Sequence, residues 1–88
     1  MRDIDELIKA GVRAQREKLE ANNHKKPFTG LSYEFLFNRL VDEVKELREA
    51  FEANDVDEKG YRNIRHEAAD VANFAHMIIL KCDKILPP

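Results

Sequence analysis

The sequence has 88 residues, the size of one small domain, and a domain of this size buries only about 60–65% of the surface of its unfolded chain. Apolar residues make up 43% of the chain and charged residues 36%, a composition that excludes a disordered tail. The formal net charge is -2 at pH 7, so no overall positive field attracts polymeric nucleic acid or an anionic membrane. We therefore expect a small folded domain that gains stability from a partner chain.

The cysteine content and the N-terminal residues predict where the protein works. Cys82 is the single cysteine, which excludes an intrachain disulfide, and no Cys/His cluster has the spacing of zinc ligands. Residues 1–6 are charged where a signal peptide would be apolar, and the longest apolar run is the four residues 77–80. These features predict a cytoplasmic protein that does not enter a membrane.

The apolar residues fall into three helical segments separated by two polar joints, without strand-like alternation or an internal repeat. The predicted fold class is therefore all-α. The first helix is expected over about 3–22, with Asp3 as its N-cap. Its apolar stripe, at steps of three and four residues, comprises Ile4, Leu7, Ile8, Gly11, Val12, Gln15 and Leu19.

The two other helices follow joints that contain helix-breaking residues. The second helix is expected over about 32–53, with Ser32 as the preferred N-cap and Thr29 as the alternative. The third helix is expected over about 60–85, after a polar joint that ends in glycine, and Pro87 prevents its extension.

Small side chains line one side of the third helix, namely Ala68, Ala69, Ala72 and Ala75. They let a neighbouring helix approach closely, and the second helix is the expected neighbour. An alanine face beside a Leu/Phe face also suits contact between subunits, and three short helices bury little area alone. We therefore expect the three-helix protomer to form a four-helix-bundle-type core that is completed by oligomerisation.

Acidic residues lie at the edges of two apolar stripes, where a solvated charge is not ordinarily placed. Glu43 and Glu46 flank the apolar face of the second helix. Glu67 and Asp70 flank the apolar face of the third helix with the same angular offset. Antiparallel packing would bring the four carboxylates together, and their repulsion in a partly dry cleft costs free energy unless a cation neutralises them. Because all donors are oxygens, Mg2+ is the predicted ion, with Mn2+ as the alternative.

Two other interpretations of these acids are a di-iron site and a solvated acidic surface. A carboxylate-bridged di-iron site needs a Glu-x-x-His pair, but asparagine stands three residues before both His66 and His76. A chain with 17 acidic residues also produces acidic pairs by chance, so a solvated acidic surface stays an alternative. The repetition of one offset on two helices favours the metal site.

The sequence around these acids carries two short motifs in a fixed order. An E-x-x-E motif lies within LVDEVKELREA at 40–50, and an E-x-x-D motif lies within EAADVANF at 67–74. The pattern resembles the MazG-like members of the all-α nucleoside triphosphate pyrophosphohydrolase superfamily, over about residues 31–82. In that family the two motifs bind Mg2+. The metal ligands that the resemblance implies are Glu43, Glu46, Glu67 and Asp70.

The resemblance also implies an activity. Family members hydrolyse a nucleoside triphosphate between the α and β phosphorus atoms, which gives a monophosphate and pyrophosphate and serves house-cleaning or control of the dNTP pool. The catalytic residues implied are Asp42, Glu43 and Glu46, with Asp42 positioning or deprotonating the attacking water. The family commonly has Glu at this first position, and the shorter Asp42 is expected to alter the rate without abolishing metal binding. A homodimer or a dimer of dimers is expected, because oligomers are usual in the family.

Five further residues are candidates for contacts with the nucleotide. Phe74 lies one turn beyond the acidic pair of the third helix, and it either stacks on a base or belongs to the core. Asn73 either bonds a sugar hydroxyl or a phosphate, or is a surface amide. Lys81 aligns with the same acidic pair in helical projection, and His24 and Lys26 lie in the first joint. These cations suit phosphates, although solvated lysines are the commoner case.

Two functions other than the enzyme are open at this stage. The first is a catalytically silent nucleotide-binding or regulatory helical dimer, which would bind Mg2+ and nucleotide without releasing pyrophosphate. The second is a structural helical assembly protein, which would gain no thermal stability from Mg2+. The full set of four predicted ligands favours the enzyme, because a protein without activity has no need of clustered acids that repel one another.

Overall fold

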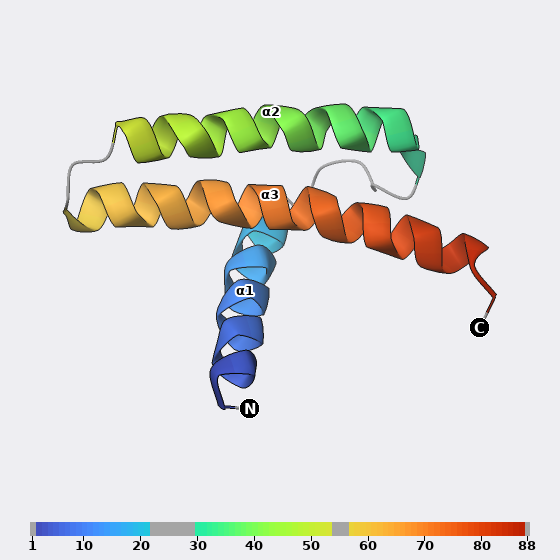
Figure 1. Cartoon of the computed structure of the whole chain (residues 1–88), viewed down its shortest axis with the longest axis horizontal. Coiled ribbons are helices and arrows are strands. Elements are labelled where there is room, and N and C mark those ends of the chain that lie inside the picture. The colour runs from blue at the N-terminus through green and yellow to red at the C-terminus, as the bar shows by residue number, and fades with distance from the viewer. Residues whose placement is uncertain (1, 22–29, 54–56, 88) are drawn as a thin grey trace.

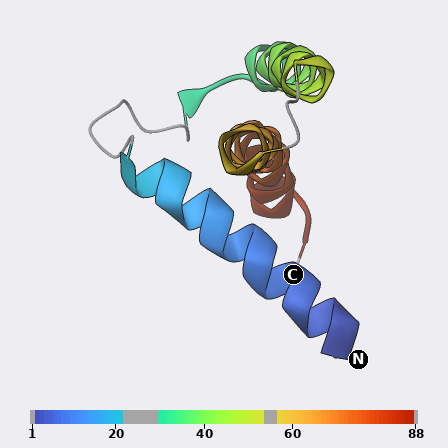
Figure 2. The same cartoon turned by 90° about the vertical axis from the view of Figure 1, so that its left-hand side faces the viewer.

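The structure, a computed structural model, describes residues 2–21, 30–53 and 57–87, and these residues form an all-α fold as predicted. The helices are α1 (Arg2–Ala21), α2 (Tyr33–Glu52) and α3 (Glu58–Ile85). Helices α2 and α3 lie side by side and antiparallel (Figure 1). Helix α1 crosses α3 on the side away from α2 (Figure 2). The central element is therefore α3, which carries the second acidic motif and contacts both other helices.

Side-chain caps define the starts of α2 and α3. Ser32 caps α2 as predicted, and its hydroxyl accepts a hydrogen bond from the Phe35 amide at 3.1 Å. Asp57 caps α3 by accepting from the Gly60 amide at 2.7 Å. Helix α3 therefore begins at Glu58 rather than near residue 60, because the carboxylate of Asp57 satisfies an amide of the first turn.

The start of α1 corrects one prediction. The helix begins at Arg2, so Asp3 lies within the first turn and not at the N-cap. A carboxylate in this turn still interacts favourably with the positive end of the helix dipole. The helix ends at Ala21, and the predicted last residue 22 and the alternative cap Thr29 lie outside the described residues.

The cap of α3 gives a direct test of this local structure. Replacing Asp57 by Ala is expected to lower the free energy of unfolding by about 1 kcal/mol, because the Gly60 amide loses its acceptor. Urea unfolding followed by circular dichroism measures the change. Asp57→Asn keeps an acceptor and is the matched control; an equal loss in both variants would mean that the cap hydrogen bond is not the cause.

The buried apolar core of one chain is small. Leu36 is 1% exposed and is the one large side chain that is fully buried among the described residues. The other buried apolar residues of this part of the chain are Ala14, Ala50 and Ala69. The burial of Ala69 agrees with the close helix approach predicted for this side of the third helix, whereas Ala68 is exposed.

Most of the apolar stripe predicted for the first helix does not enter a core within this chain. Ala14 and Gln15 are buried, because α1 crosses α3 steeply and touches it over a short stretch (Figure 1). The large apolar members of the stripe are all exposed, namely Ile4, Leu7, Ile8, Val12 and Leu19. Even so, no helix within the described ranges is both long enough and apolar enough to cross a membrane. The four-helix core that a second copy would complete stays a prediction.

Candidate metal centre

Acidic residues of α2 and α3 meet where these two helices pack. Ligand atoms of Glu43, Glu46 and Glu67 all lie within 4.8 Å of one another. His66, Glu67 and Asp70 form a second group that satisfies the same distance and shares Glu67. The acids of the two motifs are therefore close neighbours, with Asp70 connected to the α2 pair through Glu67.

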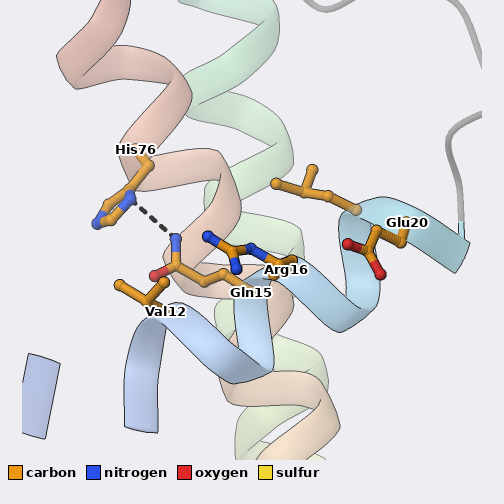
Figure 3. A pocket seen from close by; sticks show the side chains of 6 residues that line it. Val12, Gln15, Arg16, Glu20 and His76 are labelled. Carbon is orange, nitrogen blue, oxygen red and sulfur yellow. Dashed lines mark hydrogen bonds between the residues drawn. The ribbon is translucent and has the colours of Figure 1, made fainter. Parts of the chain in front are cut away.

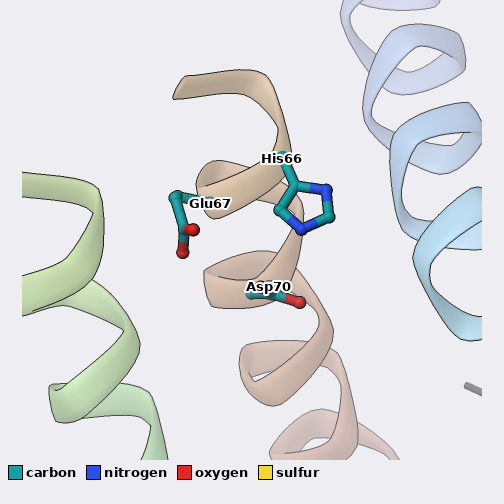
Figure 4. A group of neighbouring side chains, drawn as sticks. All are labelled: His66, Glu67 and Asp70. Carbon is teal, nitrogen blue, oxygen red and sulfur yellow. The ribbon is translucent and has the colours of Figure 1, made fainter. Parts of the chain in front are cut away.

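The side chains of α3 at this point face two different helices. Figure 4 shows Glu67 directed toward α2, whereas His66 and Asp70 are directed toward α1. Positions 67 and 70 are separated by about 60° around the helix axis, so the acids lie on the boundary between the two packed faces. The acidic residues of α3 therefore face both neighbouring helices, with Glu67 toward α2 and Asp70 toward α1.

Glu43 is the most buried carboxylate of the group, with 4% of the residue exposed. Its Oε1 accepts a hydrogen bond from Arg39 at 2.8 Å, whereas Oε2 is buried and no donor of the described residues faces it. Glu67 Oε2 is also buried without a donor. A buried oxygen without a partner is costly, and one divalent cation satisfies several carboxylate oxygens at once. The donor set therefore fits Mg2+ or Mn2+.

Burial and mutual repulsion raise the pKa of two carboxyl groups. Burial is the main cause that raises the pKa of Glu43 to about 7; Glu46 and Asp70 add to the effect, and Arg39 opposes it. Burial likewise raises the pKa of Glu67, with further contributions from Glu46 and Asp70 and opposition from His66. Because metal ligands must be deprotonated, a cation bound here at neutral pH would displace a proton from this cluster.

Two cations beside the centre were missed by the sequence analysis. Arg39 precedes Glu43 by one turn and pairs with it at 2.8 Å. Lys18 of α1 lies 3.2 Å from Asp70 Oδ2 and donates a hydrogen bond to His66 Nε2 at 2.6 Å. The i,i+4 spacing of Arg39 and Glu43 is a signal that could have been read from the sequence. Lys18 has no such signal, because its position depends on how α1 crosses α3.

Asp42 lies apart from the grouped carboxylates. Its side chain is about half exposed and forms a long ion pair of 4.0 Å with Arg39. It belongs to neither group of ligand atoms, whereas Glu46 belongs to one of them and is also exposed to solvent. The catalytic role implied for Asp42 stays a prediction, and Glu46 is the most solvent-exposed carboxylate of the two groups.

The two candidate substrate residues that follow Asp70 both have neighbours within the chain. Asn73 is buried, so it is not a surface amide; its Nδ2 donates to the Gln15 carbonyl at 3.5 Å, and no donor of the described residues faces its Oδ1. Phe74 is half-buried, and the guanidinium of Arg39 lies 5.3 Å from the centre of its ring. The Arg39 side chain therefore contacts both the Phe74 ring and Glu43, beside the candidate metal centre.

The remaining candidate substrate residues are not brought to the acids within the described residues. Lys81 lies over the ring of Tyr33, 5.1 Å from its centre. The rise of a helix places Lys81 roughly 16 Å along α3 from Asp70. His24 and Lys26 lie outside the described residues.

An open groove between α1 and α3 is a separate feature (Figure 3). It has a volume of about 380 Å³, and Gln15 Nε2 is hydrogen-bonded to His76 Nδ1 at 2.9 Å in it. Its lining residues are Val12, Gln15, Arg16, Leu19, Glu20 and His76. None of the clustered carboxylates lines this groove, so the groove is separate from the candidate metal centre.

Comparison with known proteins gives little beyond this geometry. No protein-family model matches the sequence, and no solved structure matches it. An uncharacterized protein of Archaeoglobus fulgidus is 44% identical over 52 residues, which are 59% of this chain and 50% of the relative. The chain thus spans about half the length of the curated relative that it matches.

Proposed function

We propose that the protein is a Mg2+-dependent nucleoside triphosphate pyrophosphohydrolase that cleaves the α–β phosphoanhydride into a nucleoside monophosphate and pyrophosphate. The observation that carries the proposal is the buried oxygen of Glu43 that no donor faces, beside Glu46 and Glu67 where the two motif helices pack. A carboxylate-held Mg2+ commonly serves substrates with a phosphate chain. The choice of reaction is supported by the resemblance of the two motifs to the MazG-like enzymes.

Each residue has a separate task in the proposed reaction. A bound Mg2+ supplies charge neutralisation of the phosphates and lowers the pKa of a coordinated water. Glu43, Glu46 and Glu67 would hold the ion. Asp70, the fourth ligand that the resemblance implies, lies beside Glu67 on the side of α1. Asp42 lies one residue before Glu43 and faces solvent, and the role that the resemblance implies for it is to orient the attacking water and accept its proton. No covalent nucleophile is needed, because water attacks the anhydride directly.

The proposed enzyme works on the soluble nucleotide pool of the cytoplasm, without polymeric nucleic acid or a membrane as partner. The test is pyrophosphate release from a panel of canonical and modified NTPs and dNTPs with Mg2+ or Mn2+. Turnover of at least one nucleotide is expected. Thermal stabilisation by Mg2+ and nucleotide without pyrophosphate release would favour the silent binding module, and absence of both responses would leave the structural protein.

We further propose that a second copy of the chain covers the exposed apolar faces, in a homodimer or a dimer of dimers. Leu7 of α1 is 73% exposed and Phe37 of α2 is 60% exposed. By contrast, only one large side chain of the described residues, that of Leu36, is fully buried. Surfaces of this kind are rarely left in water by a stable domain.

Light scattering is expected to give at least twice the chain mass of 10.3 kDa. Leu7→Glu should shift the protein toward the monomer, because it places a charge in the covered face. Lys9→Gln makes the same change in net charge on α1 and should not. A monomeric wild type at every concentration would contradict the proposal.

A further inference from the structure

The contact between α1 and α3 is built around one carboxylate of the proposed metal centre. Lys18 Nζ lies 3.2 Å from Asp70 Oδ2 and 2.6 Å from His66 Nε2, and its side chain is 16% exposed. An ion pair between Glu17 and Arg65, at 2.8 Å, lies beside it. Few residues of α1 are buried, so these polar contacts, together with the hydrogen bonds of Gln15 to His76 and Asn73, help to hold it on α3.

The ammonium group of Lys18 already contacts two of the atoms that could hold a cation. His66, Glu67 and Asp70 offer ligand atoms within 4.8 Å of one another, and Lys18 contacts His66 and Asp70 in this group. A divalent cation held by the same atoms would lie against the ammonium. Two positive charges this close repel strongly at a partly buried position, so both cannot keep Asp70 as a close partner.

We infer that Lys18 is an internal competitor of the metal ion: it occupies Asp70 when the centre is empty and must leave Asp70 when a divalent cation binds. The inference rests on the proposed function and adds a residue that sets the metal affinity of the centre. Linkage makes the competition reciprocal, because the free energy that the Lys18 contact gives to the docking of α1 is lost when the metal binds. Metal binding therefore loosens α1 from α3.

The test measures binding of Mn2+ alone to the full chain by calorimetry. Lys18→Met keeps the length of the side chain and removes its charge, and it should bind Mn2+ about tenfold more tightly than wild type. Lys18→Arg keeps the charge and should bind as wild type does. Lys9→Met removes a charge from an exposed position of the same helix and should also have no effect.

The outcomes separate this inference from the proposed function. Equal, measurable Mn2+ affinities of wild type and Lys18→Met would overturn the competition and leave the metal centre intact. Absence of Mn2+ binding in both proteins would overturn the competition together with the metal centre.

A second measurement needs no variant and is independent of whether Lys18→Met folds. Hydrogen exchange of the wild-type backbone amides should become faster in α1 on addition of Mn2+, while exchange in the middle of α3 becomes slower or stays unchanged. Exchange in α1 that is unchanged or slower with saturating Mn2+ would overturn the inference. Release of α1 is expected because its Lys18 contact with Asp70 is replaced by repulsion.

Discussion

Glu46→Gln is expected to lower pyrophosphate release at least about 100-fold and to remove the rise in melting temperature that Mg2+ produces. The amide keeps the size of the side chain but removes the negative charge from a ligand atom that lies within 4.8 Å of those of Glu43 and Glu67. Because Glu46 is exposed, the substitution should leave the fold intact. Asp70→Asn should act in the same direction on the α1 side of the centre. Initial rates at saturating nucleotide and thermal unfolding with and without Mg2+ measure both effects.

The matched control for this prediction is Glu49→Gln. Glu49 is an exposed acid of the same helix, three residues after Glu46, and it belongs to neither group of ligand atoms. Its substitution removes the same charge from the helix and should leave both the rate and the Mg2+ response unchanged. A Glu46→Gln variant that responds to Mg2+ as wild type does would show that the proposed centre is not the metal site.

In the absence of metal, the free energy of unfolding is expected to fall by about 2 kcal/mol between pH 5 and pH 8. The pKa of Glu43 is raised from 4.5 to about 7 in the folded protein, so the folded state holds a proton that the unfolded state has released. This contribution is fully present below pH 4.5 and is lost as the pH rises through about 7. The raised pKa of Glu67 also lowers the free energy of unfolding as the pH rises. The expected loss is smaller than the full pKa shift implies, because the carboxyls titrate together.

Two changes should remove this pH dependence. Glu43→Gln lacks the titrating group, so it should flatten the slope and stabilise the metal-free protein at pH 8. Saturating Mg2+ should flatten the slope of the wild type, because the ion takes the place of the proton. Urea unfolding at several pH values, with chelator or with Mg2+, measures both. A metal-free wild type that becomes more stable from pH 5 to pH 8 would contradict the repulsion assigned to the cluster.

Helical periodicity predicted the number, order and approximate limits of the helices. The predicted limits are wrong where a single side chain decides where a helix begins: Asp57 accepts from the Gly60 amide, so α3 begins at Glu58 and not near residue 60. The path of α1 could not be predicted for a different reason. Its apolar stripe has the same pattern whether it packs within the chain or against another chain, and the crossing that leaves Leu7 exposed is a tertiary property.

The candidate site was predicted as far as spacing within single helices allows. Acids at i,i+3 on two packed helices were expected to meet, and the structure groups Glu67 with the α2 acids. Contacts that depend on side-chain packing or on the path of α1 could not be predicted from the spacing of residues in the sequence. They include the burial of Asn73, the contact of the Arg39 guanidinium with the Phe74 ring and the ion pair of Lys18 with Asp70. Each depends on how the helices pack against one another.

The most direct test of the metal centre is anomalous diffraction from crystals of the protein grown with Mn2+. We expect an anomalous peak in contact with carboxylate oxygens of Glu43, Glu46 and Glu67, and Asp70 separated from Lys18. A well-ordered α2–α3 pair at saturating Mn2+ without a peak between these carboxylates, or with the ion bound elsewhere, would contradict the metal centre and with it the proposed hydrolysis.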